Sequence, residues 1–204
     1  MTEPSRTLPR TDQPFPITCE LFERMVESGV IPRDRRVYLW DGSLIEKMAK
    51  SRDHAAVQAV FTTILARRLP EPYYVGPENP VRLDATHVPL PDLIVLRENP
   101  LRAHSTRYPD GRDVLLVVEI SVTSLPEDLG PRLARYASCL PLAGYVVADV
   151  PGRRILVHSR PIPAQGDQPG KYESVQTVTA GGRLQLTIDG IALDPIPYEQ
   201  LLPQ

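Results

Sequence analysis

The chain has 204 residues, of which 42% are hydrophobic and 24% are charged, so it can bury a core of domain size and is not expected to be disordered throughout. The net charge of −2 argues against a surface dominated by phosphate contacts, although it allows a local one. No apolar run reaches the roughly 18–20 residues that cross a bilayer. Residues 1–13 lack an apolar signal core, and the two cysteines are too few for a disulfide framework. We therefore expect a cytoplasmic protein that does not enter membranes.

The N-terminal end is predicted to be a flexible leader over residues 1–16, which are rich in proline, threonine and arginine. A single domain is expected over residues 17–204, because no linker and no internal repeat divides this part. Its first helix is predicted over Cys19–Ser28, with Thr18 as the N-cap and Gly29 at the end.

A β-hairpin is predicted next. The Asp-Gly dipeptide at residues 41–42 favours a two-residue turn between the strands Arg36–Trp40 and Ser43–Met48. Because side chains alternate along a strand, Glu46 would share a face with apolar neighbours and Lys47 would point to the opposite face. A carboxylate among apolar side chains is costly without a partner, which makes Glu46 a candidate functional residue.

The rest of the chain alternates between helical and extended patterns. The longest helix is predicted over Ser51–Leu69, whose apolar residues recur at i, i+3 and i+4. The run Val114–Ser121 is the most apolar in the chain and predicts a central strand buried on both faces. Further strands are expected at 73–83, 88–96, 144–149, 153–159, 172–179 and 183–188, a loop at 97–112 and a helix at 128–140. This order predicts an α/β fold, a mixed sheet flanked by helices.

Two acidic residues stand where they could share a cation. Asp92 opens a strand directly after a proline, and Glu119 lies near the end of the most apolar strand. Carboxylates at the ends of adjacent strands can hold Mg²⁺ or Mn²⁺, and such an ion activates water and neutralises charge at a phosphate. Glu46 is a candidate third oxygen donor. An alternative stays open, in which Asp92 caps a turn and Glu119 pairs with an arginine such as Arg132 or Arg135.

Several motifs follow one another in a characteristic order. They are the DG hairpin ending at Glu46, His54 early in a helix, Pro91-Asp92, Val118-Glu119-Ile120-Ser121, Asp128 four residues before Arg132, Tyr136-Ala137 and the GYVVAD strand. Together they resemble the Uma2 family, once called DUF820, of restriction-endonuclease-like proteins in the PD-(D/E)xK nuclease superfamily. The resemblance covers about residues 17–195, nearly the whole chain.

The resemblance implies a restriction-endonuclease-like core with a metal site at the open edge of the sheet. Asp92 and Glu119 match the acidic residues of its motifs, and Glu46 matches an upstream acidic residue of the family. Ser121 stands where the superfamily has a lysine. In this family a lysine on the following helix supplies that charge, and here its position holds Arg132. Arginine stays protonated, so it can stabilise negative charge at a phosphate but is not suited to accept a proton.

The resemblance and the residues together predict a metal-dependent endonuclease that hydrolyses phosphodiester bonds in DNA. Asp92, Glu119 and Glu46 would be its metal ligands, and Arg132 would stabilise the developing charge. His54 would either support the hairpin or orient Glu46 or a water at the metal, with Ser121 in a similar supporting role. The alternative is a nuclease-fold protein that no longer cuts and binds nucleic acid or a protein partner. A homodimer would suit an enzyme that cuts both strands of a duplex.

Overall fold

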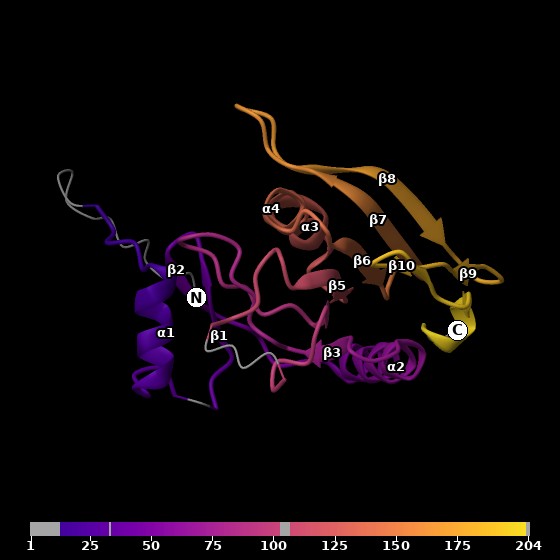
Figure 1. The fold of residues 1–204 in the computed structure, drawn as a ribbon, viewed down its shortest axis with the longest axis horizontal. Helices are drawn as coiled ribbons and strands as arrows, with labels where there is room; N and C mark the ends of the chain where they lie inside the picture. Colours follow the sequence, from indigo (N-terminus) through magenta and orange to yellow (C-terminus); the bar gives the residue numbers. More distant parts are fainter. Residues whose placement is uncertain (1–12, 33, 103–106, 203–204) are drawn as a thin grey trace, which may run out of the picture.

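The computed structural model describes residues 13–32, 34–102 and 107–202. Its centre is a six-stranded mixed sheet with the strand order β3-β4-β5-β6-β7-β8 (Figure 1). Neighbouring strands are antiparallel except β5 and β6, which are parallel. The strands are β3 Tyr74–Pro77, β4 Leu93–Leu96, β5 Val114–Ser121, β6 Gly144–Asp149, β7 Arg154–Ile162 and β8 Lys171–Val178. A mixed sheet flanked by helices confirms the predicted fold class.

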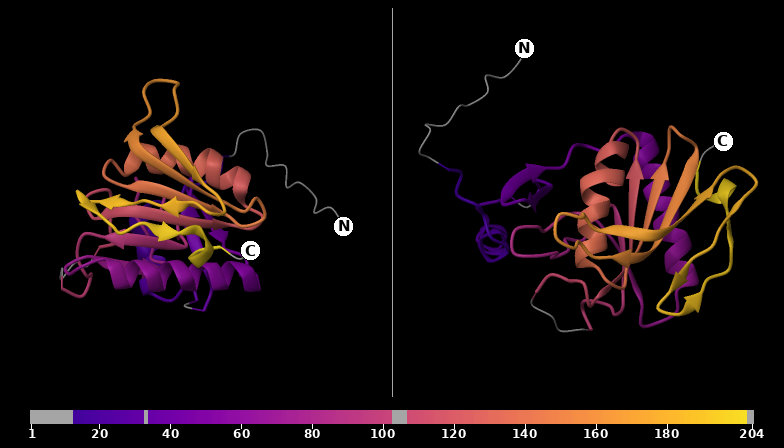
Figure 2. Two further views of the ribbon diagram at one scale, coloured as in Figure 1. Left: turned by 90° about the vertical axis from the view of Figure 1, so that its right-hand side faces the viewer. Right: turned by 90° about the horizontal axis from the view of Figure 1, so that it is seen from above.

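Helices cover both faces of this sheet, which lies between α2 and α4 in Figure 2. The long helix α2 (Arg52–Arg68) packs on one face together with the C-terminal segment, and α4 (Leu133–Cys139) packs on the other. The short helices are α1 Cys19–Glu27, α3 Leu125–Glu127, a π-helical turn η1 Asp128–Arg132 and a 3₁₀ turn η2 Tyr198–Gln200. The parallel pairing of β5 with β6 requires a crossover, and α3, η1 and α4 form it.

The central strand β5 is buried along its whole length, from Val114 to Ser121. It lies between β4 and β6, and apolar clusters cover both of its faces. The prediction of a strand buried on both faces is therefore confirmed. Glu119 is held inside this strand, with 1% of its surface exposed.

A small N-terminal lobe carries the predicted hairpin. It contains α1 and the two-stranded sheet of β1 (Val37–Trp40) and β2 (Ser43–Glu46). Asp41 and Gly42 have positive φ angles of 49° and 68°, the conformation of a primed hairpin turn. Thr18 caps α1 as predicted, because its hydroxyl accepts a hydrogen bond from the Leu21 amide.

Prolines and one glycine account for two of the departures from the predicted elements. The strand expected over 88–96 shrinks to β4, because Pro89 and Pro91 lack an N–H to donate. The helix expected over 128–140 is broken at Gly130, whose φ of −109° and ψ of −106° are not helical, and Pro131 follows it.

The two ends of the chain complete the fold. Residues 1–12 of the predicted leader lie outside the described residues, and residues 13–16 form neither helix nor strand. The strand expected over 183–188 is divided into β9 and β10, and two further short strands follow. These C-terminal strands are β9 Arg183–Leu184, β10 Thr187–Ile188, β11 Ile191–Ala192 and β12 Ile196–Pro197. Within the described ranges, no helix is both long enough and apolar enough to cross a membrane.

Candidate active site at the ends of β4 and β5

Asp92 and Glu119 come together where β4 begins and β5 ends. The antiparallel register pairs Leu93 with Val118, which brings the residues beside them together. The Asp92 amide donates a hydrogen bond to Glu119 Oε2 at 3.1 Å, and the Ile120 amide donates to Asp92 Oδ2 at 2.8 Å. The sheet backbone thus donates one hydrogen bond to each of the two carboxylates.

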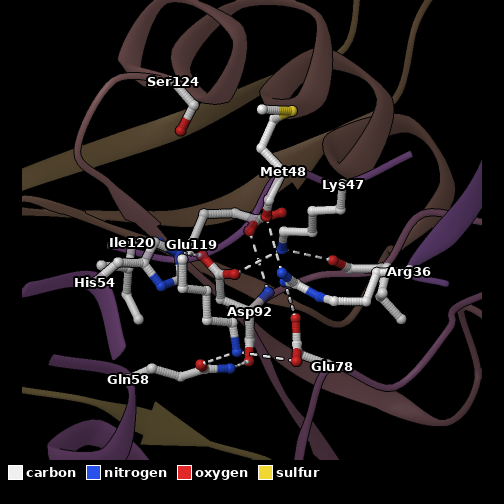
Figure 3. A network of polar contacts seen from close by, with 12 residues as sticks. Arg36, Lys47, Met48, His54, Gln58, Glu78, Asp92, Glu119, Ile120 and Ser124 are labelled. Carbon is white, nitrogen blue, oxygen red and sulfur yellow. Dashed lines mark hydrogen bonds and ion pairs between the residues drawn. The ribbon is translucent and has the colours of Figure 1, made fainter. Parts of the chain in front are cut away.

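Two side chains from outside the sheet hold the Asp92 carboxylate (Figure 3). Lys47 Nζ lies 2.6 Å from Asp92 Oδ1, and His54 Nε2 lies 2.9 Å from Oδ2. Lys47 follows β2 directly, and His54 occupies the first turn of α2, where the Ser51 hydroxyl accepts a hydrogen bond from its amide. Burial by itself raises the pKa of Asp92, but the His54 hydrogen bond and the Lys47 charge outweigh it and hold the pKa well below the usual range.

Glu119 has fewer compensating partners. Its Oε1 accepts hydrogen bonds from the Tyr136 hydroxyl at 2.9 Å and from Arg132 at 3.2 Å. Burial raises the pKa of Glu119 to about 7, and the Arg132 charge opposes this only in part, while Asp92 adds to it. The two neighbouring carboxylates therefore have pKa values displaced in opposite directions.

A third buried carboxylate, Asp128, holds the arginine in place. Arg132 lies 3.2 Å from Asp128 Oδ1 as well as from Glu119. The other Asp128 oxygen accepts hydrogen bonds from the hydroxyls of Ser121 at 2.5 Å and Ser124 at 2.6 Å. Ser121 therefore acts on the arginine through Asp128, and it does not contact Asp92.

The site opens into a cavity of about 510 Å³. Asp92, Lys47, His54 and Arg132 all line it. Because the lining carries the carboxylates of Asp92 and Glu46 together with several basic side chains, the cavity is suited to an anionic ligand held beside a cation.

Further polar residues continue the network of contacts around Asp92, as Figure 3 shows. Gln58 donates to the Asp92 carbonyl at 2.5 Å and accepts a hydrogen bond from Lys50. Lys50 also lies 2.9 Å from Glu78, which pairs with Arg36 as well. The positive charges of Lys50 and Arg36 are thus already shared with a carboxylate.

Glu46 lies elsewhere than the strand alternation indicated. Its side chain is 48% exposed and forms a 2.5 Å ion pair with Arg35, so it is not buried among apolar neighbours. It lines the same cavity but has no contact with Asp92 or Glu119. The expectation of a buried Glu46 was wrong because β1 and β2 form a separate two-stranded sheet, and all of β2 is exposed.

Lys47 also lies where strand alternation did not place it. Period-two alternation put it on the face opposite to Glu46 and away from the site. The strand ends at Glu46, however, and alternation no longer applies one residue later. The sequence nevertheless contained a signal that could have pointed to Lys47 as a site residue. The chain contains few lysines, and this one directly follows the hairpin that the motif series places near the metal site.

The oxygen donors present suit Mg²⁺ or Mn²⁺, which prefer carboxylates and water. No group of three or more His, Cys, Asp or Glu residues is arranged around a common point in the described ranges. Protein cations now compensate the two carboxylates, Lys47 on Asp92 and Arg132 on Glu119. A divalent cation at this pair would have to compete with these positive groups for the carboxylate oxygens.

Comparison with solved structures first defines the class of fold. A crystal structure described as a putative nuclease belonging to DUF820, from Anabaena variabilis, superposes with a TM-score of 0.60. The two sequences are 14% identical, and the match covers 91% of this chain and 97% of the other. This chain therefore has the same fold as that nuclease-like protein.

A family model then identifies the family. The model for Uma2, described as "Putative restriction endonuclease", matches residues 19–194. The chain belongs to the Uma2 family, which confirms the resemblance seen in its motifs. A comparison with curated proteins gave no match.

Proposed function

We propose that this protein is a metal-dependent endonuclease that hydrolyses phosphodiester bonds in DNA. The main support is the meeting of Asp92 and the buried Glu119 beside an open cavity, whose wall carries Asp92, Lys47, His54 and Arg132. Membership of a family described as restriction endonucleases agrees with this chemistry.

The contacts of each residue indicate its role in the proposed reaction. Asp92 and Glu119 would hold Mg²⁺ or Mn²⁺, and Glu46, on the wall of the same cavity, would assist through water. When bound, such an ion supplies a water of lowered pKa and compensates charge at the phosphate. Arg132 keeps its proton because Glu119 and Asp128 face it, so it can stabilise the negative charge of the reacting phosphate. His54 positions Asp92 through the contact of its Nε2 with Oδ2.

Plasmid cleavage in Mg²⁺ or Mn²⁺ tests the proposal. Asp92→Asn and Glu119→Gln keep the shape of each side chain and remove its charge, so each is expected to lower the cleavage rate by about 100-fold or more. Glu173→Gln is the matched control, because Glu173 lies on β8 and, among the described residues, pairs only with Arg160 at the surface. Equal cleavage by all four proteins would exclude the assignment. Linear product, as opposed to nicked circles, would favour paired sites in a homodimer.

One observation supports a second function, a nuclease fold that binds nucleic acid or a protein partner without cutting. Protein donors already serve both carboxylates, and the cation nearest to Glu119 is Arg132, which cannot act as a base. This arrangement is compatible with a site that needs no metal ion.

Calorimetric titration with Mn²⁺ separates the two functions. Micromolar binding that disappears in Asp92→Asn supports the enzyme, and no binding in the wild type supports the second function. Arg132→Lys adds a further distinction, since cleavage gained by this variant alone would locate the loss of catalysis at position 132.

A further inference from the structure

We infer that Lys47 occupies the cation position on Asp92, so that its ammonium group and a divalent cation bind this carboxylate in turn and never together. The inference rests on the proposed metal site at Asp92 and Glu119. It gives Lys47 a specific role, that of an internal counter-ion which must leave before a metal ion can bind.

The hydrogen bonds of Asp92 show for which of its two carboxylate oxygens Lys47 and a metal ion would compete. Oδ2 accepts from the Ile120 amide at 2.8 Å and lies 2.9 Å from His54 Nε2, so the sheet and α2 already hold it. Within the described part of the chain, Lys47 is the one donor to Oδ1. Because Oδ2 has two partners and Oδ1 has one, Oδ1 is the oxygen through which a second cation would bind.

Distances make joint binding unfavourable. Lys47 Nζ lies 2.6 Å from Oδ1. A magnesium ion binds a carboxylate oxygen at roughly 2.0–2.1 Å, so an ion on the free lone pair of Oδ1 would lie roughly 4 Å from Nζ. Three positive charges would then be concentrated in a partly desolvated place, where electrostatic repulsion is only weakly screened.

The chain around Lys47 permits its departure. Lys47 follows β2, and residues 47–50 belong to no helix or strand. Next to it, Met48 is 83% exposed, so the segment is not locked into a core. Lys47 Nζ also donates a hydrogen bond to the Leu90 carbonyl at 2.9 Å. A small rotation of the lysine side chain can keep or break this hydrogen bond.

The destination of the released ammonium group connects metal binding with substrate binding. Lys47 lines the same cavity as Arg132, so once it leaves Asp92 its charge is free to pair with an anionic group there. Metal loading would then create a site for a phosphate oxygen at the same time.

The test compares Mn²⁺ binding, measured by calorimetry, in three proteins. Lys47→Met keeps the chain length and removes the charge, and it is expected to bind Mn²⁺ about tenfold more tightly than the wild type because the competing cation is gone. Lys50→Met is the matched control: it removes a charge from the same cavity, but Lys50 contacts Glu78 and Gln58 and not the Asp92 carboxylate. A change of less than about threefold is expected there.

Thermal unfolding gives a second readout that does not depend on activity. Without metal, Lys47→Met is expected to melt below the wild type, because Asp92 loses its charge partner. Mn²⁺ should raise its melting temperature more than it raises that of the wild type. If Lys47→Met does not fold, Lys47→Gln, which keeps a neutral donor, is measured in the same way.

The outcomes distinguish this inference from the proposed function. Weaker Mn²⁺ binding in Lys47→Met, or equal tightening in Lys47→Met and Lys50→Met, would overturn the competition while leaving the metal site in place. Absence of Mn²⁺ binding in every protein, including Lys47→Met, would instead remove the metal site itself. Tighter binding confined to position 47 supports the inference.

Discussion

At the scale of single residues, neighbouring charges decide how burial affects a side chain. Asp92 and Glu119 touch each other and are both buried, yet the pKa of Asp92 is lowered and that of Glu119 is raised to about 7. Asp92 has Lys47 and His54 against its carboxylate, whereas Glu119 shares Arg132 with Asp128. Opposite displacements in adjacent groups are typical of sites with distinct acid and base roles.

The same principle applies away from the site, in a group of aromatic rings between α4 and the β7–β8 pair. His158 and Tyr172 have ring centroids 5.7 Å apart. His158 Nε2 and the Tyr172 hydroxyl are buried, and neither has a hydrogen-bond partner in the described ranges. Burial lowers the pKa of His158, because the charged imidazolium is poorly solvated there.

A pH-dependent loss of stability is expected from His158. Its folded-state pKa lies below the unfolded value, so the unfolded chain binds the proton first as the pH falls, and stability decreases from about pH 7 toward pH 5. His158→Phe should reduce this decrease, as measured by urea unfolding at several pH values. Tyr172→Phe is the control, because it removes an unpaired hydroxyl and should raise stability by about 1 kcal/mol equally over this range. An unchanged pH dependence in His158→Phe would show that another group is responsible.

At the scale of elements, the hairpin of β1 and β2 delivers Lys47 to the sheet. Its turn is fixed from both sides: the Ile17 amide donates to the Gly42 carbonyl at 2.9 Å, and the Gly42 amide donates to Thr86 at 3.1 Å. A methyl group on Gly42 would lie 2.9 Å from Pro16 Cβ. The positive φ and the close contact both require glycine here.

Gly42→Ala is therefore expected to destabilise the protein by about 2 kcal/mol, measured as the free energy of unfolding in urea. Gly166→Ala is the matched control, since Gly166 also has a positive φ, of 56°, but nothing lies within 4 Å of an added Cβ. Its cost should be about 1 kcal/mol, from the backbone conformation alone. If both variants lost the same amount, the contact with Pro16 would contribute nothing.

The elements also show how much of the fold and of the site could be predicted from the sequence. β5 and α2 were predictable because a long apolar run and a regular apolar stripe are strong local signals, and the structure places both as expected. The approach of Asp92 to Glu119 followed from adjacent strands. Lys47 was not predictable, because an irregular segment carries it and its direction depends on how the hairpin docks on the segment before β4, which no local pattern encodes.

At the scale of the molecule, the N-terminal lobe is too small to be stable alone. Its core consists of five buried residues, Cys19, Phe22, Ile31, Leu39 and Val88. Backbone contacts connect it to the segment before β4, where the Leu39 amide donates to the Val88 carbonyl and the Cys19 amide to that of Ala85. The lobe should therefore fold only together with the central sheet, as one domain over residues 17–204.

The only tryptophan makes this cooperation measurable. Trp40 lies in the lobe, with its ring centroid 4.9 Å from that of His87, whereas Phe61 is buried on α2 against the central sheet. Phe61→Ala leaves a cavity and is expected to cost about 3–5 kcal/mol. Urea unfolding followed by Trp40 fluorescence and by circular dichroism should shift by the same amount, because one transition unfolds both parts. A fluorescence transition that stays at its wild-type midpoint would show that the lobe unfolds independently, and Lys47 would then belong to a separately folding unit that docks onto the carboxylates.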